Sequence, residues 1–176
     1  MSSVKWTQNF HNHHYNSILL CTKNSPAAKQ ASLQGLQTIE INQPKDYLSF
    51  QTRRDLKKII ELYQPKAFFN HLTRDLWHLS PILKKYPNIQ LFNFARMFIR
   101  GVKKHDWFHR YIYSRLDTMI ALSHIQKSLL LEALPIPDIK YAVIPNAVDT
   151  EKFQPRPANK NIRQDLGVTN DNQLLV

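Results

Sequence analysis

Short apolar runs alternate with amphipathic segments along most of the chain, and this alternation restricts the possible folds more than any other feature of the sequence. Apolar runs of strand length lie at residues 17–21, 38–41, 67–70, 89–94, 118–122 and 141–144. Strands that alternate with helices are typical of βαβ units, whose strands run parallel. The sequence therefore predicts an α/β fold in which helices flank a parallel sheet.

Local signals mark where several helices begin and end. Ser25 followed by Pro26 predicts a helix start, because serine caps the first amides and proline suits the first helical position. Gly35 is placed to end that helix. Ser123 with Gln126 matches a capping box and predicts a helix over residues 125–134. Apolar stripes at helical spacing predict further helices over residues 56–63, 76–86 and 108–116.

The composition indicates a folded protein with an anionic partner. The chain has 176 residues, 43% of them hydrophobic, which is enough to bury one core. Lys and Arg total 24 against 13 Asp and Glu, giving a net charge of +11 that favours nucleic acid, an anionic membrane surface or a phosphorylated substrate. Cys21 is the single cysteine, and no run approaches the ~18 apolar residues of a membrane span. We therefore expect a cytoplasmic protein.

The two ends of the chain differ from its middle. Residues 1–14 are predicted to form a poorly defined segment, and their histidines, His11, His13 and His14, have no cysteine or acidic partner at metal-ligand spacing. Residues 15–153 are expected to form one domain. A proline-bearing linker, a short helix at 162–166 and a strand starting at 173 indicate that residues 154–176 begin a further domain whose remainder is missing.

Two stretches follow a family pattern in the right order. Residues 102–117 hold VKKHDWFHRYIYSRLD and lead into MIALS at 119–123, and VIPNAVD at 143–149 is followed by Phe153 and Pro155. Together they resemble the N-terminal domain of family 4 glycosyltransferases, which has a basic stretch, a strand that ends in serine and an exit turn of the form iPNGVD. His71, after the apolar run 67–70, resembles the strand-end histidine of that family. The resemblance covers most of the chain from residue 15 onward.

The resemblance implies a Rossmann-like domain, the N-terminal half of a GT-B architecture. Such an enzyme transfers a sugar from a nucleotide-sugar donor to a carbohydrate or lipid-linked acceptor, and the family needs no metal. The family's first strand, glycine-containing loop and first helix are absent or replaced by residues 1–14, and Ala147 stands where glycine is usual. The nucleotide pocket of the family lies in its C-terminal domain. We therefore expect a fragment that is truncated at both ends, binds no cofactor itself and is inactive alone.

His71 is the candidate catalytic residue. A histidine at a strand end is expected to accept the proton of the acceptor hydroxyl or to orient the sugar, because its ordinary pKa lies near working pH. A structural histidine is the alternative. Asn146 and Asp149 match the exit turn and are expected to form a hinge beside a cleft between domains.

Basic and acidic side chains near the predicted strand ends are candidates for binding an anionic acceptor. In open parallel sheets ligands lie at the carboxyl ends of the strands, and Lys and Arg pair well with phosphate oxygens. We expect the charged turn before Trp107 and the turn at Asn146 to face a common cleft. Asp106 alternatively caps a helix. The candidate anion-binding residues are Arg74, Asp75, Arg96, Arg100, Lys103, Lys104 and Asp106.

A different class of function stays open, namely a basic, non-enzymatic module that binds nucleic acid or an anionic membrane surface. Nucleic acid is disfavoured because the aromatic residues form no stacking platform and the basic residues are spread over several helices. A peripheral position on the inner face of the membrane is compatible with the enzymatic hypothesis. Phe108 and Tyr111 are expected in the core, and Trp107 is left open between core and bilayer.

Overall fold

The computed structural model describes residues 3–44, 49–96, 103–151, 153–155 and 167. The chain divides into two compact units, Met1–Asn146 and Ala147–Val176, and the described helices and strands lie in the first. In chain order these are α1 (Ser3–Asn12), β1 (Leu19–Thr22), α2 (Pro26–Leu33), β2 (Thr38–Ile41), α3 (Phe50–Tyr63), β3 (Ala67–Asn70), the 3-10 helix η1 (Thr73–Asp75), α4 (Leu76–Leu83), β4 (Gln90–Phe94), α5 (Trp107–Tyr113), β5 (Thr118–Ala121), α6 (His124–Ala133), the 3-10 helix η2 (Asp138–Lys140) and β6 (Tyr141–Val143).

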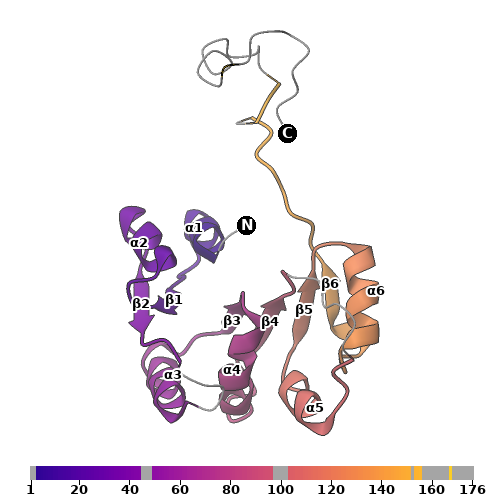
Figure 1. The fold of residues 1–176 in the computed structure, drawn as a ribbon. Helices are drawn as coiled ribbons and strands as arrows, with labels where there is room; N and C mark the ends of the chain where they lie inside the picture. Colours follow the sequence, from indigo (N-terminus) through magenta and orange to yellow (C-terminus); the bar gives the residue numbers. More distant parts are fainter. Residues whose placement is uncertain (1–2, 45–48, 97–102, 152, 156–166, 168–176) are drawn as a thin grey trace. The chain divides into compact units, whose positions relative to one another are not determined.

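The strands form two sheets, and every described strand pair is parallel (Figure 1). One sheet has two strands, β1 and β2, and the other has four in the order β3-β4-β5-β6. Helices alternate with the strands along the chain. The predicted class, an α/β fold with parallel strands flanked by helices, is confirmed. Its division into two sheets was not predicted.

Helix starts follow the predicted capping chemistry. The hydroxyl of Ser25 accepts the N–H of Ala28 at 3.2 Å, and Pro26 opens α2. The hydroxyl of Ser123 accepts the N–H of Gln126 at 3.1 Å at the start of α6. These bonds satisfy amides that have no partner inside the helix. Gly35, after α2, has a φ of +66°, a conformation that glycine adopts without steric cost.

The main hydrophobic core is formed by the four-stranded sheet and helices α3, α4, α5 and α6. Leu76, Leu83, Leu91 and Leu116 are each 0% exposed. Burying a leucine side chain stabilises the fold by about 1.5–3 kcal/mol. Other members of this core are Leu56, Ile60, Leu79, Met119, Ala121, Leu130 and Leu134.

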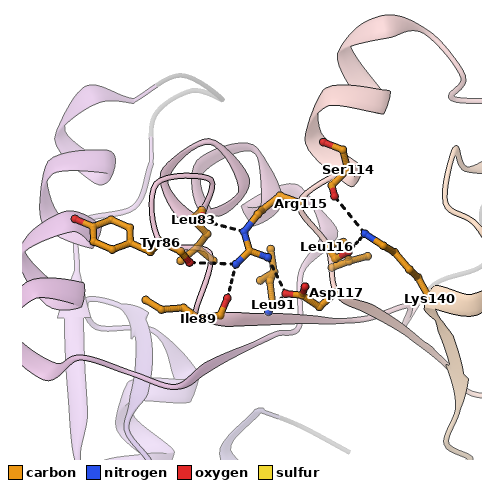
Figure 2. A network of polar contacts seen from close by, with 9 residues as sticks. All are labelled: Leu83, Tyr86, Ile89, Leu91, Ser114, Arg115, Leu116, Asp117 and Lys140. Carbon is orange, nitrogen blue, oxygen red and sulfur yellow. Dashed lines mark hydrogen bonds and ion pairs between the residues drawn. The ribbon is translucent and has the colours of Figure 1, made fainter.

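A network of polar contacts closes the amino end of the four-stranded sheet (Figure 2). The guanidinium of Arg115 donates to the carbonyls of Leu83, Tyr86 and Ile89, and it pairs with Asp117 at 2.7 Å. Lys140 donates to the carbonyl of Leu116 at 2.6 Å. Arginine suits this place because its donors form a rigid planar fork. The network fixes the end of α4 to the starts of β4 and β5.

Three structural expectations were wrong or fall outside the described residues. The segment 1–14 is not poorly defined, because Ser3–Asn12 form α1 and Val4 is 1% exposed within a second core with Leu19, Ala31 and Leu36. Tyr111 is 43% exposed rather than buried, with the ammonium of Lys84 3.3 Å from its ring centre. The predicted helix at 162–166 and strand at 173–176 lie outside the described residues.

Candidate functional site

Two asparagines and a methionine lie side by side across β3, β4 and β5. The parallel register pairs Asn70 with Asn93 and Asn93 with Met119. The Nδ2 of Asn70 donates to Oδ1 of Asn93 at 2.7 Å and to the carbonyl of Leu72 at 2.8 Å, and Nδ2 of Asn93 donates to the sulfur of Met119 at 3.3 Å. Buried amides need such partners, and Asn93 is 0% exposed. The three side chains thus fix the strand ends relative to one another.

His71 and Arg96 extend directly from these strand ends and meet. The Nη2 of Arg96 lies 2.7 Å from Nδ1 of His71. The imidazole stacks on the ring of Phe94, with ring centres 4.7 Å apart and planes inclined by 6°, and Trp6 of α1 packs against the same ring at 4.9 Å. The structure therefore brings two of the sequence-predicted site residues together, on an aromatic ring that limits their movement.

The contact with Arg96 fixes the tautomer of His71. A guanidinium has only donors, so Nδ1 of His71 accepts and the ring hydrogen lies on Nε2. Burial, and then the positive charge of Arg96, lower the pKa of His71 to about 4. The imidazole is thus neutral at pH 7, and its Nε2–H is a hydrogen-bond donor.

This depressed pKa predicts a specific pH dependence of stability. The unfolded chain binds the proton of His71 with a pKa near 6.5 and the folded chain only near 4, so the unfolded state holds more protons between these values. Stability should therefore be complete above pH 6.5 and fall by roughly 1–3 kcal/mol as the pH decreases through this window, allowing for partial screening by solvent. Urea unfolding across this pH range should show the loss in the parent chain but not in His71→Gln. His124→Gln changes an exposed histidine and should still show this loss of stability. The same dependence of stability on pH in all three chains would contradict the prediction.

Arg74 and Asp75 follow His71 within one turn. Both belong to η1, which connects β3 to α4, so they also lie beyond the carboxyl end of β3. Arg74 is exposed, and Asp75 is half-buried. Burial raises the pKa of the Asp75 carboxyl, while the charge of Arg74 opposes this shift. A guanidinium and a carboxyl are therefore available next to His71 for the phosphate and hydroxyl groups of a ligand.

Gln126 was predicted as a helix cap and proves to connect two strand ends. Its Oε1 accepts the N–H of Leu122 at 2.6 Å, and its Nε2 donates to the carbonyl of Ala95 at 2.8 Å. Gln126 is 2% exposed, so both backbone groups depend on it. The side chain thereby ties the residue before Arg96 to the end of β5. The glutamine of the capping box was visible in the sequence, but its partner Ala95 lies 31 residues away.

The basic turn before Trp107 does not lie beside His71 and Arg96. The N–H of Lys104 donates to the carbonyl of Ala133 at 2.8 Å, and a ring nitrogen of His105 lies 3.0 Å from the carbonyl of Glu132. These carbonyls belong to the end of α6, which begins after the carboxyl end of β5 and returns to the amino end of β6. Lys103 and Lys104 therefore lie near the amino ends of the strands, away from His71. Arg100 lies outside the described residues.

Asp106 caps α5 in this structure. Its Oδ1 accepts the N–H groups of Phe108 at 3.1 Å and His109 at 3.0 Å, and Oδ2 lies 2.5 Å from Nδ1 of His109. These contacts with His109 lower the pKa of the Asp106 carboxyl. Trp107, the next residue, is 76% exposed. Contact of α5 with an anionic membrane surface stays a prediction.

Asn146 follows β6 at the carboxyl edge of the sheet, because the N–H of Ile144 still bonds to the carbonyl of Ala121. The expectation that Asn146 and the basic turn before Trp107 face a common cleft is wrong, since that turn lies at the opposite edge. Asp149 belongs to the second unit, where its Oδ1 accepts the N–H of Glu151 at 3.1 Å in a local turn. Its predicted hinge role is untested.

Within the described ranges, the histidine, cysteine and acidic side chains form no group of three or more that could hold a metal ion. A search of the described residues likewise finds no helix that is long and apolar enough to span a membrane.

Comparison with protein families settles the class of this chain. The Glycosyltransferase Family 4 model matches residues 6–152. The chain belongs to this family. The matched range includes α1, both sheets, His71 and Arg96. A search of curated proteins finds no match for this family 4 chain.

A glycosyltransferase from Rickettsia africae ESF-5 is a solved structure with the same fold as this family 4 chain. The two have a TM-score of 0.76 and 16% sequence identity. The superposition covers 96% of this chain but 45% of the other, so this chain spans less than half of that protein. At this identity the likeness shows the fold, which confirms the Rossmann-like class.

Proposed function

We propose that this chain supplies the acceptor-side half of a glycosyltransferase, in which His71 and Arg96 bind an anionic or hydroxyl-bearing ligand. Family membership supports sugar transfer, and the contact between these two side chains supports the site. β3 is an edge strand of the four-stranded parallel sheet. Parallel α/β sheets bind ligands beyond the carboxyl ends of their strands. His71 follows β3 directly at this end.

Arg96 and His71 have complementary tasks in this proposal. The guanidinium of Arg96 offers charged donors to a phosphate or carboxylate oxygen, and Nε2–H of His71 offers one neutral donor to a sugar oxygen. With a pKa of about 4, His71 is a poor proton acceptor at pH 7. We therefore favour orientation of the sugar over removal of a proton from the acceptor hydroxyl.

The complete reaction requires a nucleotide-sugar donor, and we propose that groups outside this chain bind it. The chain spans 45% of the similar glycosyltransferase, which supports a division of the reaction between two halves. The proposed acceptor is a carbohydrate or a lipid-linked glycan, and the chain alone is proposed to be inactive. Stabilisation of the leaving diphosphate would then come from the other half, since transition-state charge needs donors placed next to it.

Replacement of Arg96 provides the test of the site. We expect Arg96→Gln to weaken the binding of glucose 1-phosphate, used as a probe, by about tenfold, because a charge-assisted hydrogen bond contributes roughly 1.5–3 kcal/mol. Heteronuclear NMR titration of the chain would measure this, with Nε2 of His71 as the reporter.

Arg110→Gln is the matched control. Arg110 is exposed on α5 and donates to the carbonyl of His105, at the amino edge of the sheet. It should leave probe binding unchanged. Chemical-shift changes on adding glucose 1-phosphate that appear around Lys104 and Arg110 instead of His71 would contradict the proposed site. They would favour the amino edge of the sheet as the anion-binding region.

A further inference from the structure

One buried ring contacts both polar side chains of the candidate site. Phe94 ends β4 and is 3% exposed. The imidazole of His71 stacks on this ring, with ring centres 4.7 Å apart and planes inclined by 6°. The guanidinium carbon of Arg96 lies 5.8 Å from the centre of the same ring. Because stacked rings and cations both interact favourably with an aromatic face, Phe94 gives His71 and Arg96 a common support.

Helix α1 supplies a further aromatic contact to this ring. Trp6 packs against Phe94 with ring centres 4.9 Å apart and planes inclined by 46°. Phe10, one turn further along α1, contacts Trp6 at 5.7 Å and Phe69 of β3 at 4.8 Å between ring centres. Val4 is 1% exposed and anchors the helix in the second core. α1 therefore contacts both β3 and β4, the two strands that lead into the candidate site.

The contact with Trp6 restricts the ring on which His71 lies. His71 follows β3 outside any helix or strand, and its side chain is held by the stack on Phe94 and by the contact of Nδ1 with Nη2 of Arg96 at 2.7 Å. The second contact requires an unprotonated Nδ1, because a guanidinium only donates. Without Trp6 the ring of Phe94 gains freedom and water reaches the imidazole, which favours the protonated form. Loss of Trp6 therefore weakens both contacts of His71.

We propose that Trp6, acting through the ring of Phe94, is a positioning residue that holds His71 in contact with Arg96. Trp6 touches no ligand in this role, and it limits instead the movement of the ring beneath the two side chains. This role of α1 rests on the proposed function, in which the aligned imidazole and guanidinium bind the ligand. A ligand then meets donors that are already ordered, so its binding loses less side-chain entropy.

Replacing Trp6 by leucine tests this role in the ligand-free chain. Trp6→Leu keeps an apolar side chain but removes the ring that packs on Phe94. NMR titration should show the pKa of His71 rise from about 4 toward 6.5, because burial and the nearby charge of Arg96 both decrease. Trp6→Phe retains a ring and should keep the pKa low. Trp107→Leu is the matched control, since Trp107 is 76% exposed on α5, and it should leave the pKa of His71 unchanged.

Binding of glucose 1-phosphate, followed by the same NMR titration as for Arg96→Gln, is the second readout. Trp6→Leu should weaken this binding by about two- to tenfold, the range expected from the loss of one aromatic pair. Trp107→Leu should not weaken it. If Trp6→Leu does not fold, Trp6→Met offers an apolar side chain without a ring and is measured in the same way.

The positioning role and the proposed function can fail separately. An unchanged pKa of His71 in Trp6→Leu overturns the positioning role, even where urea unfolding shows a loss of stability, because Trp6 would then only stabilise the fold. If the parent chain does not bind glucose 1-phosphate near His71, the proposed function fails. The ligand-free titration still decides in that case whether Trp6 holds His71 against Arg96.

Discussion

Replacing Arg115 by methionine is expected to lower the free energy of unfolding by roughly 3–5 kcal/mol. The side chain of Arg115 is 10% exposed. Its guanidinium donates hydrogen bonds to the carbonyls of Leu83, Tyr86 and Ile89 and pairs with the carboxylate of Asp117. Methionine fills similar volume but donates nothing, so these acceptors lose their partner (Figure 2). Urea unfolding followed by circular dichroism measures the change, and a typical domain has about 5–15 kcal/mol to lose.

Two further variants show whether the loss of stability comes from the contacts of Arg115 or from replacing any arginine. Arg115→Lys should fall between the parent and Arg115→Met, because one ammonium group cannot reach acceptors arranged around a planar fork. Arg110→Met removes an exposed arginine with one bond to the carbonyl of His105, and it should change stability by less than about 0.5 kcal/mol. A loss below about 1 kcal/mol in Arg115→Met would show that water replaces the guanidinium at these carbonyls.

The strands were predictable because their signal is local. The predicted runs 38–41 and 67–70 coincide with β2 and β3, and the others differ from the observed strands by one or two residues at one or both ends. Parallel strands covered on both faces are short and continuously apolar. Gly35 and Pro65 lie just before the runs 38–41 and 67–70 and separate these strands from the preceding helices. The caps at Ser25 and Ser123 are equally local. For these elements neighbouring residues contain most of the necessary information.

Expectations failed where a distant neighbour decides the outcome. The spacing of Phe108, Tyr111 and Ile112 defines one face of α5, but only packing against Trp77 of α4 decides that Phe108 is covered and Tyr111 is not. α1 is held by tertiary contacts such as the one between Trp6 and Phe94. Tertiary packing commonly outweighs local propensity in this way.

The candidate site was predictable as a set of residue types but not as an arrangement. His71 ends an apolar run, and Arg96 follows another, so both were placed at strand ends from the sequence. Their contact depends on the register of β3 and β4, which pairs Asn70 with Asn93 across the sheet. Lys103 and Lys104 follow the same strand as Arg96, yet Lys104 bonds to the carboxyl end of α6, near the opposite edge of the sheet. Their distance along the sequence does not reveal this placement.

The second large effect is expected at Gln126, where stability and the candidate site are coupled. Gln126→Leu keeps the volume of a side chain that is 2% exposed but leaves the N–H of Leu122 and the carbonyl of Ala95 without their partner. Each buried backbone group left unsatisfied costs about 1–3 kcal/mol, so the loss of both partners should lower the free energy of unfolding by roughly 2–6 kcal/mol. Because Ala95 precedes Arg96, the variant should also loosen the contact between Arg96 and His71 and weaken the binding of glucose 1-phosphate.

Gln51→Leu is the control for this variant. Gln51 is an exposed glutamine of α3 whose Nε2 donates to Asp55 at 2.8 Å, and its replacement should change stability by less than about 0.5 kcal/mol without affecting the ligand. Urea unfolding and the NMR titration, performed on the same samples, distinguish two roles of Gln126. A loss of stability with unchanged ligand binding would show that Gln126 holds the sheet together but does not position Arg96. A loss of both would show that the tie between β4 and β5 is what places the guanidinium beside the imidazole.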